Sequence, residues 1–205
     1  MRLTILAAIA SLVAVPAQAE VFQKTANGFV IRLSADVKAN ADETWATQVK
    51  PSEWWSKQHT WSGDAANLSV DPRAGGCWCE VLPNKESPRA TPRGSVEHMR
   101  VVYVEQGRAL RMVGGLGPLQ SEPVSGVLTV TLKPREGGSG TRIQWEYVVG
   151  GYFRYPVDQI APSVDKVLAE QLQWLAMKLG PEAATAPTAP ATPTAADDKP
   201  ATPGR

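Results

Sequence analysis

The chain has 205 residues, a formal net charge of +1 and a charged fraction of 20%. Its positive residues are scattered, which excludes a nucleic-acid footprint and a polybasic membrane patch as the basis of its function. Two cysteines are too few to staple a small fold, so ordinary apolar packing must supply the core.

Residues 1–19 predict a secretory signal peptide. A positive start at Met1-Arg2 precedes an apolar run over 3–15, and Ala17-Gln18-Ala19 fits an A-x-A cleavage site. The apolar run is too short for a stable membrane-spanning helix. We therefore expect a mature protein that begins at Glu20 and is exported, to the periplasm or the extracellular space, with no stable membrane span.

The other end of the chain, residues 181–205, consists mostly of Ala, Thr and Pro. Such a segment has too little apolar surface to offset the entropy of ordering, so we expect a disordered tail. Residues 20–180 remain, and about 160 residues are typical of one domain with a real core.

The first predicted elements are a strand and two short helices. Residues 29–37 alternate apolar and polar side chains, which indicates a strand. The capping residues at 40–43 introduce a short helix. Pro51 ends this helix and begins a second short helical turn, which contains Trp54 and Trp55.

The middle of the chain is β-rich. Runs of apolar and β-branched residues, separated by Gly- and Pro-containing turns, predict a series of antiparallel strands. The predicted strands cover residues 68–70, 77–82, 96–105, 108–114, 124–133 and 142–150.

Two predicted hairpins have a register that the side-chain pattern can define. A two-residue turn at Gln106-Gly107 would pair Glu105 with Arg108 and gather one apolar face of Val101, Tyr103, Leu110 and Met112. The opposite face would carry His98, Arg100 and Arg111, so we expect His98 at the surface. In the second hairpin, an apolar face forms if Leu128, Val130 and Leu132 lie opposite Tyr147, Trp145 and Ile143, respectively.

The last predicted element is a long helix. Its apolar residues fall at helical spacing, and Gly180 and Pro181 end it. This stripe suits a helix laid across the concave face of a sheet. It comprises Ile160, Val164, Val167, Leu168, Leu172, Leu175 and Leu179.

The amino-acid sequences of four segments resemble those of bacterial SRPBCC-domain proteins: residues 61–68, 71–80, 95–103 and 114–119. The similar proteins are close to the group named after the activator of the heat-shock-protein ATPase. The resemblance implies an α+β, START-like helix-grip fold: a curved antiparallel sheet wrapped on a long C-terminal helix, with two short helices after the first strand. It also implies an apolar cavity between sheet and helix, used in the superfamily for lipids, sterols and polyketides.

The leading hypothesis is therefore an exported, non-enzymatic binding protein for a small apolar or amphipathic molecule. Large side chains on the face toward the long helix are the candidates to line its cavity. No cofactor, metal or nucleic acid is expected. The candidate ligand-binding residues are Tyr103, Met112, Trp145, Tyr147, Val164, Leu168 and Leu172.

Two other functions stay open. An enzyme of the cyclase or hydrolase type would use His98 with a nearby acid, and it would place His98 inside the cavity near a carboxylate. A protein-interaction or chaperone-like module would need no small ligand. Activation of a chaperone ATPase itself is disfavoured, because that partner is cytosolic and an exported protein would not meet it.

Cys77 and Cys79 are two apart on a predicted strand and so share a face. Their Cα atoms would be about 6.5 Å apart, near the upper edge of disulfide geometry, so a bridge would be strained and easily reduced. A metal site lacks ligands, since only His98 offers a third. We expect two reduced thiols packed as small apolar groups.

Overall fold

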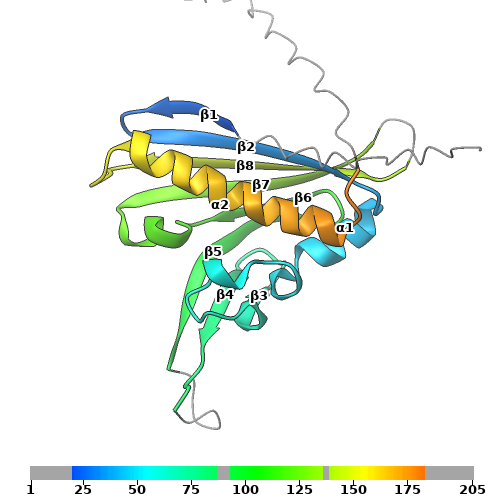
Figure 1. Cartoon of the computed structure of the whole chain (residues 1–205), viewed down its shortest axis with the longest axis horizontal. Helices are drawn as coiled ribbons and strands as arrows, with labels where there is room; N and C mark the ends of the chain where they lie inside the picture. Colours follow the sequence, from blue (N-terminus) through cyan, green and yellow to red (C-terminus); the bar gives the residue numbers. More distant parts are fainter. Residues whose placement is uncertain (1–19, 87–92, 136–138, 183–205) are drawn as a thin grey trace, which may run out of the picture.

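Eight antiparallel strands form one curved sheet in the computed structural model, which describes residues 20–86, 93–135 and 139–182 (Figure 1). The strand order is β1-β2-β8-β7-β6-β5-β4-β3. The strands are β1 (Glu20–Thr25), β2 (Gly28–Val37), β3 (Leu68–Val70), β4 (Cys77–Leu82), β5 (Gly94–Glu105), β6 (Ala109–Val113), β7 (Val124–Pro134) and β8 (Thr141–Gly151).

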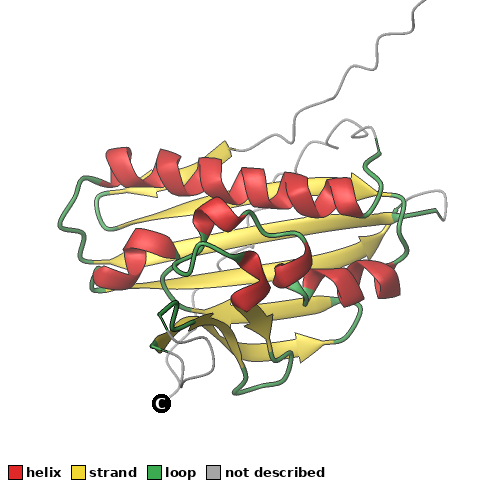
Figure 2. Cartoon of the chain, turned by 60° about the horizontal axis from the view of Figure 1, so that its bottom comes forward, coloured by secondary structure: helices red, strands yellow, loops and turns green. Residues whose placement is uncertain are grey.

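The helices lie over one face of this sheet (Figure 2). This arrangement confirms the predicted α+β class, with a curved antiparallel sheet and a long C-terminal helix. The helices are α1 (Ala41–Gln48), α2 (Val157–Lys178) and four 3₁₀ turns: η1 (Pro51–Glu53), η2 (Lys57–His59), η3 (Ala65–Asn67) and η4 (Gly117–Ser121).

The start of the domain contains one strand more than the sequence predicted. β1 pairs with β2 and forms an edge of the sheet. α1 has the expected capping box, in which the Asn40 side chain accepts from the Glu43 N–H and the Glu43 carboxylate accepts from the Asn40 N–H. Beyond α1 the chain forms three 3₁₀ turns instead of a single second helix.

The β7–β8 hairpin has the predicted register. Leu128, Val130 and Leu132 lie opposite Tyr147, Trp145 and Ile143, and the pairing runs without interruption from Val124 to Pro134. β2 extends this regular region on the other side of β8. The inward side chains of these strands are buried, because a strict period of two keeps every second residue on the core face.

α2 runs across the concave face and contacts β1 and β2 (Figure 1). Val164, Leu168, Leu172 and Leu175 form its buried stripe, as predicted. Burying a Leu side chain contributes about 1.5–3 kcal/mol. Gly180 follows the helix at φ 76°, a left-handed conformation that costs glycine little.

The β5–β6 hairpin differs from the prediction. The turn contains three residues, so Glu105 pairs with Ala109 instead of Arg108. A β-bulge at Val102 compensates for this shift and returns Val101 to its place opposite Met112. Tyr103 consequently lies on the outer face, where it is 44% exposed, and the prediction that it faces α2 was wrong.

Two residues of the predicted tail belong to the folded part. Pro181 forms an isolated bridge with Val37, and the Glu182 N–H donates to the Asp36 carbonyl at 3.0 Å. Glu182 also forms an ion pair with Arg135. The predicted signal peptide and the rest of the predicted tail, 183–205, lie outside the described residues. Within the described ranges, no helix has the length and apolar character needed to cross a membrane.

Candidate functional site

Trp54 and Trp55 pack on the inner face of the sheet, beside α2 (Figure 2). The Trp54 ring lies 6.0 Å from that of Trp145, and the Trp55 ring lies 4.7 Å from that of Trp78 (centroid to centroid). Each of the two inserted indoles donates its N–H at 2.9 Å to a backbone carbonyl of the flanking segment 47–59. The face that was expected to line a cavity is therefore covered in part by two further aromatic side chains.

The predicted ligand-binding residues, other than Tyr103, all lie in the core of the domain. Those from the sheet are packed beneath the helices, and those from α2 form the buried stripe. Both sets belong to one buried hydrophobic cluster. The six buried residues are Met112, Trp145, Tyr147, Val164, Leu168 and Leu172.

Tyr147 also anchors the glycine-rich loop before η4. Its hydroxyl donates to the Gly114 carbonyl at 3.0 Å and accepts from the Leu116 N–H at 3.1 Å. Burial raises the pKa of Tyr147 to about 12. The hydroxyl stays protonated at neutral pH and holds residues 114–116 against the sheet.

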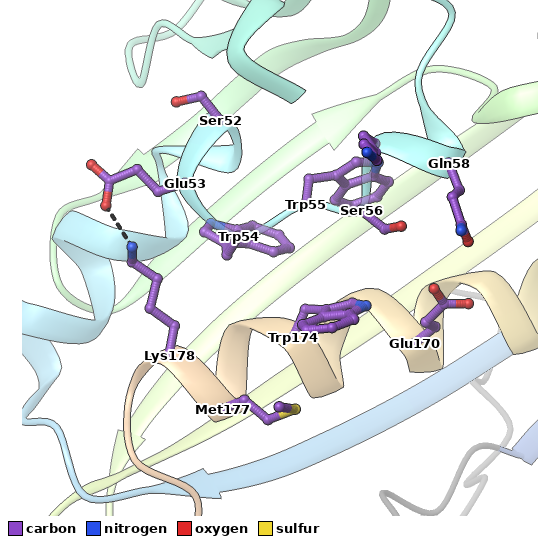
Figure 3. Close-up of a pocket in the computed structure, with 11 residues that line it drawn as sticks. Ser52, Glu53, Trp54, Trp55, Ser56, Gln58, Glu170, Trp174, Met177 and Lys178 are labelled. Atoms are coloured by element: carbon purple, nitrogen blue, oxygen red, sulfur yellow. Dashed lines mark ion pairs between the residues drawn. The ribbon is translucent and has the colours of Figure 1, made fainter. Parts of the chain in front are cut away.

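An open groove of about 590 Å³ lies between the segment 52–58 and the last turns of α2 (Figure 3). Ligand pockets in proteins span about 300–1,000 Å³. On the α2 side, Trp174 and Met177 are 46% and 54% exposed, although both are large apolar residues. The groove, called the Trp174 groove below, is lined by Ser52, Glu53, Trp54, Trp55, Ser56, Lys57, Gln58, Glu170, Trp174, Met177 and Lys178.

Charged groups lie at the two ends of the Trp174 groove. At one end, Lys178 Nζ lies 3.1 Å from a Glu53 carboxylate oxygen, and its hydrogen bond and charge lower the pKa of Glu53. At the other end, a Glu170 carboxylate oxygen lies 3.4 Å from His59 Nε2. The apolar surface of the groove is thus bounded by charges, an arrangement that suits a molecule with an apolar body and a polar end.

A buried glutamine ties the two walls of the groove together. The Ser56 N–H donates to Gln171 Oε1 at 2.8 Å, and Gln171 is fully buried on α2. Its Nε2 has no hydrogen-bond partner among the described residues. The wall formed by 52–58 is therefore fixed to α2 by a direct polar contact.

A second polar cluster lies on the buried face of β4 and β5. The Glu80 side chain is fully buried and accepts hydrogen bonds from the Trp61 N–H at 3.1 Å and the Ser62 N–H at 2.5 Å. His98 Nε2 lies 2.9 Å from the same carboxylate, and the His98 side chain is 8% exposed. Glu80 and His98 are called the buried pair below.

The prediction that His98 lies at the surface was wrong. Trp78 pairs with Met99, whereas Cys79 pairs with Glu97, so His98 is the extra residue of a β-bulge in β5. A bulge breaks the alternation of side chains, and both His98 and Met99 turn to the buried face. The sequence pattern assumed strict alternation and so placed His98 with Arg100 and Arg111.

The hydrogen bonds define the protonation of the buried pair. Burial works to raise the pKa of Glu80, but the hydrogen bonds from Ser62, Trp61 and His98 outweigh it and hold the pKa below its ordinary value. Burial lowers the pKa of His98, which the Glu80 hydrogen bond and charge oppose. His98 is therefore neutral at neutral pH, with the proton on Nε2 facing the carboxylate.

His98 also lines a second depression, of about 430 Å³. Gln120 Nε2 lies 3.4 Å from His98 Nδ1 and also donates to the Glu97 carbonyl at 3.3 Å. A neutral imidazole oriented by a carboxylate has an unprotonated nitrogen that can accept a proton. This depression is lined by Ser95, Val96, Glu97, His98, Met99, Val113, Gly114, Gly115 and Gln120.

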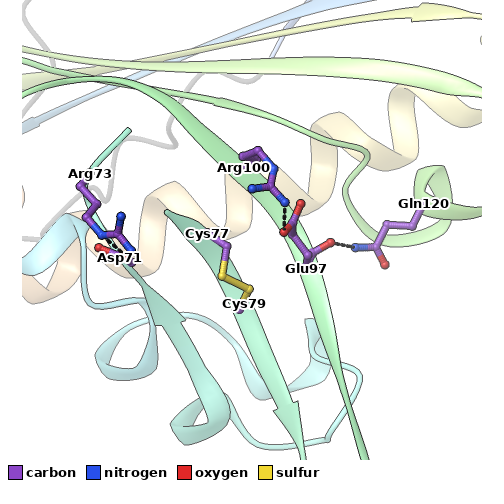
Figure 4. Close-up of a disulfide and its surroundings, with 7 residues drawn as sticks. All are labelled: Asp71, Arg73, Cys77, Cys79, Glu97, Arg100 and Gln120. Atoms are coloured by element: carbon purple, nitrogen blue, oxygen red, sulfur yellow. Dashed lines mark hydrogen bonds and ion pairs between the residues drawn. A yellow bond between two sulfur atoms is a disulfide. The ribbon is translucent and has the colours of Figure 1, made fainter. Parts of the chain in front are cut away.

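Cys77 and Cys79 form a disulfide, so the prediction of reduced thiols was wrong (Figure 4). Their Cα atoms are 5.5 Å apart, closer than a straight strand would place them. The pair lies opposite the bulge at His98, where strands twist more strongly. Both residues are partly exposed on the outer face.

In the part of the chain that the structure describes, no group of three or more His, Cys, Asp or Glu side chains is placed to hold a metal ion.

Two parts of these sites were not predicted from the sequence: Glu80 and the α2 side of the Trp174 groove. Glu170, Trp174 and Lys178 follow one another at a spacing of four, so a second helical stripe was visible beside the buried one.

Neither a protein-family model nor a curated protein matches the chain. Solved structures do match in fold. An uncharacterized protein from Rhizobium leguminosarum is 15% identical, with a TM-score of 0.53, over 80% of this chain and 98% of that one. Mll3558 from Rhizobium loti is 16% identical, with a TM-score of 0.52, over 73% and 96%. Ms6760 from Mycobacterium smegmatis is 14% identical, with a TM-score of 0.51, over 79% and 95%. At these identities the similarity shows the fold alone: a sheet with a C-terminal helix, compatible with a helix grip.

Proposed function

We propose that this chain is a binding protein of the SRPBCC type, and that its ligand is a small amphipathic molecule held in the Trp174 groove. The observation that carries the proposal is the exposure of Trp174 and Met177 on a concave surface bounded by charges. Exposure of Trp and Met side chains to water is unfavourable in free energy, and contact with an apolar ligand in the groove would remove this apolar surface from water.

The groove is a modified form of the cavity expected between sheet and helix. Because Trp54 and Trp55 pack against Trp145 and Trp78, the ligand would lie on the outer side of these indoles, between them and α2. Lys178 and Lys57 border the same surface and suit an anionic head group. We also propose export of the chain, on the basis of the signal sequence at residues 1–19.

The test is binding of a fluorescent fatty-acid analogue, dansylaminoundecanoic acid, followed by probe emission. Trp174→Ala should raise the dissociation constant about tenfold, because an aromatic contact contributes about 0.5–1.5 kcal/mol beyond its buried area. Trp61→Ala is the matched control, since Trp61 is also an exposed indole but does not line the groove. It should leave the constant unchanged.

Two outcomes would reject the carrier proposal. One is the absence of saturable probe binding by the unmodified chain, which would favour a protein-interaction module. The other is an equal loss of affinity in Trp174→Ala and Trp61→Ala, which would indicate nonspecific adsorption to exposed indoles.

A second function, acid–base catalysis, is favoured by one observation. His98 lies 2.9 Å from a buried carboxylate and also lines a depression. This is the juxtaposition that an enzyme would require. Hydrolysis of p-nitrophenyl acetate tests it: His98→Gln should lower the rate about 100-fold, whereas His59→Gln should leave it unchanged. Equal rates in the two variants would leave the buried pair a purely structural feature.

A further inference from the structure

We infer that the Cys77–Cys79 disulfide is redox-active and exchanges electrons with the cysteine pair of another polypeptide. The bridge joins two residues of a single strand, with a sequence separation of 2. β4 is already held on both sides, by β3 and by β5. A bridge that closes so short a loop constrains the unfolded chain least, so a structural role accounts poorly for it.

The position of the bridge makes it accessible. Trp78 and Glu80 alternate with the cysteines and point into the core, which leaves Cys77 and Cys79 on the outer, partly exposed face (Figure 4). Thiol–disulfide exchange requires that a thiolate reach one sulfur, and access is a main determinant of its rate. No helix covers this face, because the helices of the described residues lie on the other side of the sheet (Figure 2).

Charge distinguishes the two sulfurs. In the β4–β5 register Cys77 lies opposite Arg100, whereas Cys79 lies opposite Glu97. Arg100 and Glu97 are paired with each other at 2.8 Å. A guanidinium beside a cysteine stabilises its thiolate, so Cys77 is the better leaving group and Cys79 is the sulfur that is attacked.

The exchange balances with a dithiol as reductant. One thiolate of the dithiol attacks Cys79 Sγ, which forms a mixed disulfide while the Cys77–Cys79 bond breaks and Cys77 leaves as a thiolate beside Arg100. The second thiol of the dithiol, as its thiolate, attacks the first sulfur of the dithiol in the mixed disulfide, and Cys79 leaves as a thiolate. The dithiol is oxidised to a disulfide, Cys77 and Cys79 are reduced by two electrons, and they take up the two protons that the dithiol loses.

The surface around the bridge suits a polypeptide substrate. Val81, Val102 and Tyr103 are exposed on the outer face of β4 and β5 and offer apolar contacts near the bridge.

The inner side of β4 is held by aromatic contacts, because the Trp78 ring lies between Trp55 and His98. β4 should therefore stay in place when the bridge opens, and the two thiols should remain close enough to be reoxidised.

The first experiment uses the unmodified full chain. It is treated with dithiothreitol without denaturant, alkylated and weighed by mass spectrometry, while circular dichroism follows the fold. Both cysteines should become labelled while the spectrum is unchanged. Labelling only after unfolding would overturn the inference, because the bridge would then be an inert structural link.

The second experiment tests the role of Arg100. Arg100→Gln should slow reduction about threefold to tenfold, because the Cys77 thiolate loses its cation. Arg73→Gln is the matched control: this guanidinium is also exposed and paired with an acid, Asp71, but is not in register with either cysteine. Equal rates in the two variants would contradict the assignment of Cys77 as leaving group.

The third experiment tests the substrate class. Oxidised chain is mixed with reduced, unfolded ribonuclease A, and disulfide formation in the ribonuclease is measured. It should proceed at least about tenfold faster than with the Cys77→Ser/Cys79→Ser double variant. If dithiothreitol reduces the bridge but the ribonuclease gains no disulfides above this control, exchange with polypeptides is rejected.

Discussion

The sheet has two halves that are built differently. In one half, β2, β8 and β7 pair residue by residue without a break, and α2 supplies the apolar cover. In the other half, β5 carries two extra residues, His98 and Val102, and the cover comes from Trp54 and Trp55. The regular half can be stabilised by alternation alone, whereas the bulged half turns polar side chains inward and apolar ones outward. Both chemically suggestive features described above, the buried pair and the disulfide, lie in the bulged half.

Deletion of one residue from each half tests this difference most directly. Deletion of Thr129 from β7 should abolish cooperative folding, because Val130 and Leu132 would turn to the outer face and Lys133 inward. The loss would be comparable to the whole stability of a domain, about 5–15 kcal/mol. Urea unfolding followed by circular dichroism measures it.

Deletion of Val102 is the matched control. It removes the bulge but leaves Val101 opposite Met112 and Tyr103 opposite Arg111, so every other side chain keeps its face. The cost should be about 1 kcal/mol, the typical cost of a single change in a protein. A Val102 deletion as damaging as that of Thr129 would show that the bulge is essential to the pairing of β5 and β6.

Glu80→Ala should cost about 3–5 kcal/mol, because it leaves the donors of Trp61, Ser62 and His98 without an acceptor. Glu97→Ala, on the outer face of the neighbouring strand, should change stability by less than about 0.5 kcal/mol. Chemical denaturation of both variants checks the difference. A small effect of Glu80→Ala would mean that water replaces the carboxylate.

Near neutral pH, the pH dependence of stability should have its source in the bulged half. The pKa of His98 is lower in the folded protein than its ordinary value of 6.5, so the unfolded chain binds the proton more readily. The stability that neutral His98 contributes is therefore fully present above its ordinary pKa of 6.5. This contribution is lost as the pH drops through the folded pKa. Unfolding in urea at about pH 7.5 and about pH 5.5 should show this loss.

His98→Gln should flatten the profile over this interval, because an amide side chain at this position cannot take up a proton. An unchanged slope in His98→Gln would assign the titration to other groups. Glu80 adds a further loss at lower pH, since its pKa is also held below its ordinary value of 4.5.

The smallest expected effect concerns the end of the regular half. Truncation after Glu182 should leave the melting temperature unchanged. Truncation after Gly180 removes the Pro181 bridge to Val37 and the Glu182 hydrogen bond to Asp36. It should cost about 1 kcal/mol, or about 2–4 °C for a domain of this size. Equal melting temperatures would show that these contacts contribute nothing.

The same division explains how much could be predicted from the sequence. The register of Leu128, Val130 and Leu132 followed from strict alternation, and the α2 stripe followed from helical spacing. Tyr103 and His98 were misplaced, because a single inserted residue shifts every later assignment by one face and leaves no mark in the composition.

The candidate site was harder to predict than the fold. Trp54 and Trp55 were visible as adjacent aromatic residues, but their partners, Trp145 and Trp78, lie far away in the sequence. The disulfide required a contraction of β4 opposite the bulge, and that depends on pairing with β5. Contacts set by tertiary pairing are not encoded in local spacing.

The aromatic contacts have a spectroscopic consequence. Rings follow one another from Trp145 through Trp54, Trp55 and Trp78 to His98, with successive centroids 6.0, 5.5, 4.7 and 5.9 Å apart. Indoles this close couple excitonically, and excitation absorbed by one of the four tryptophans can pass to its neighbours. Their near-ultraviolet circular dichroism should be intense. Quenching of the ring at one end, Trp78, should therefore dim the emission of the others.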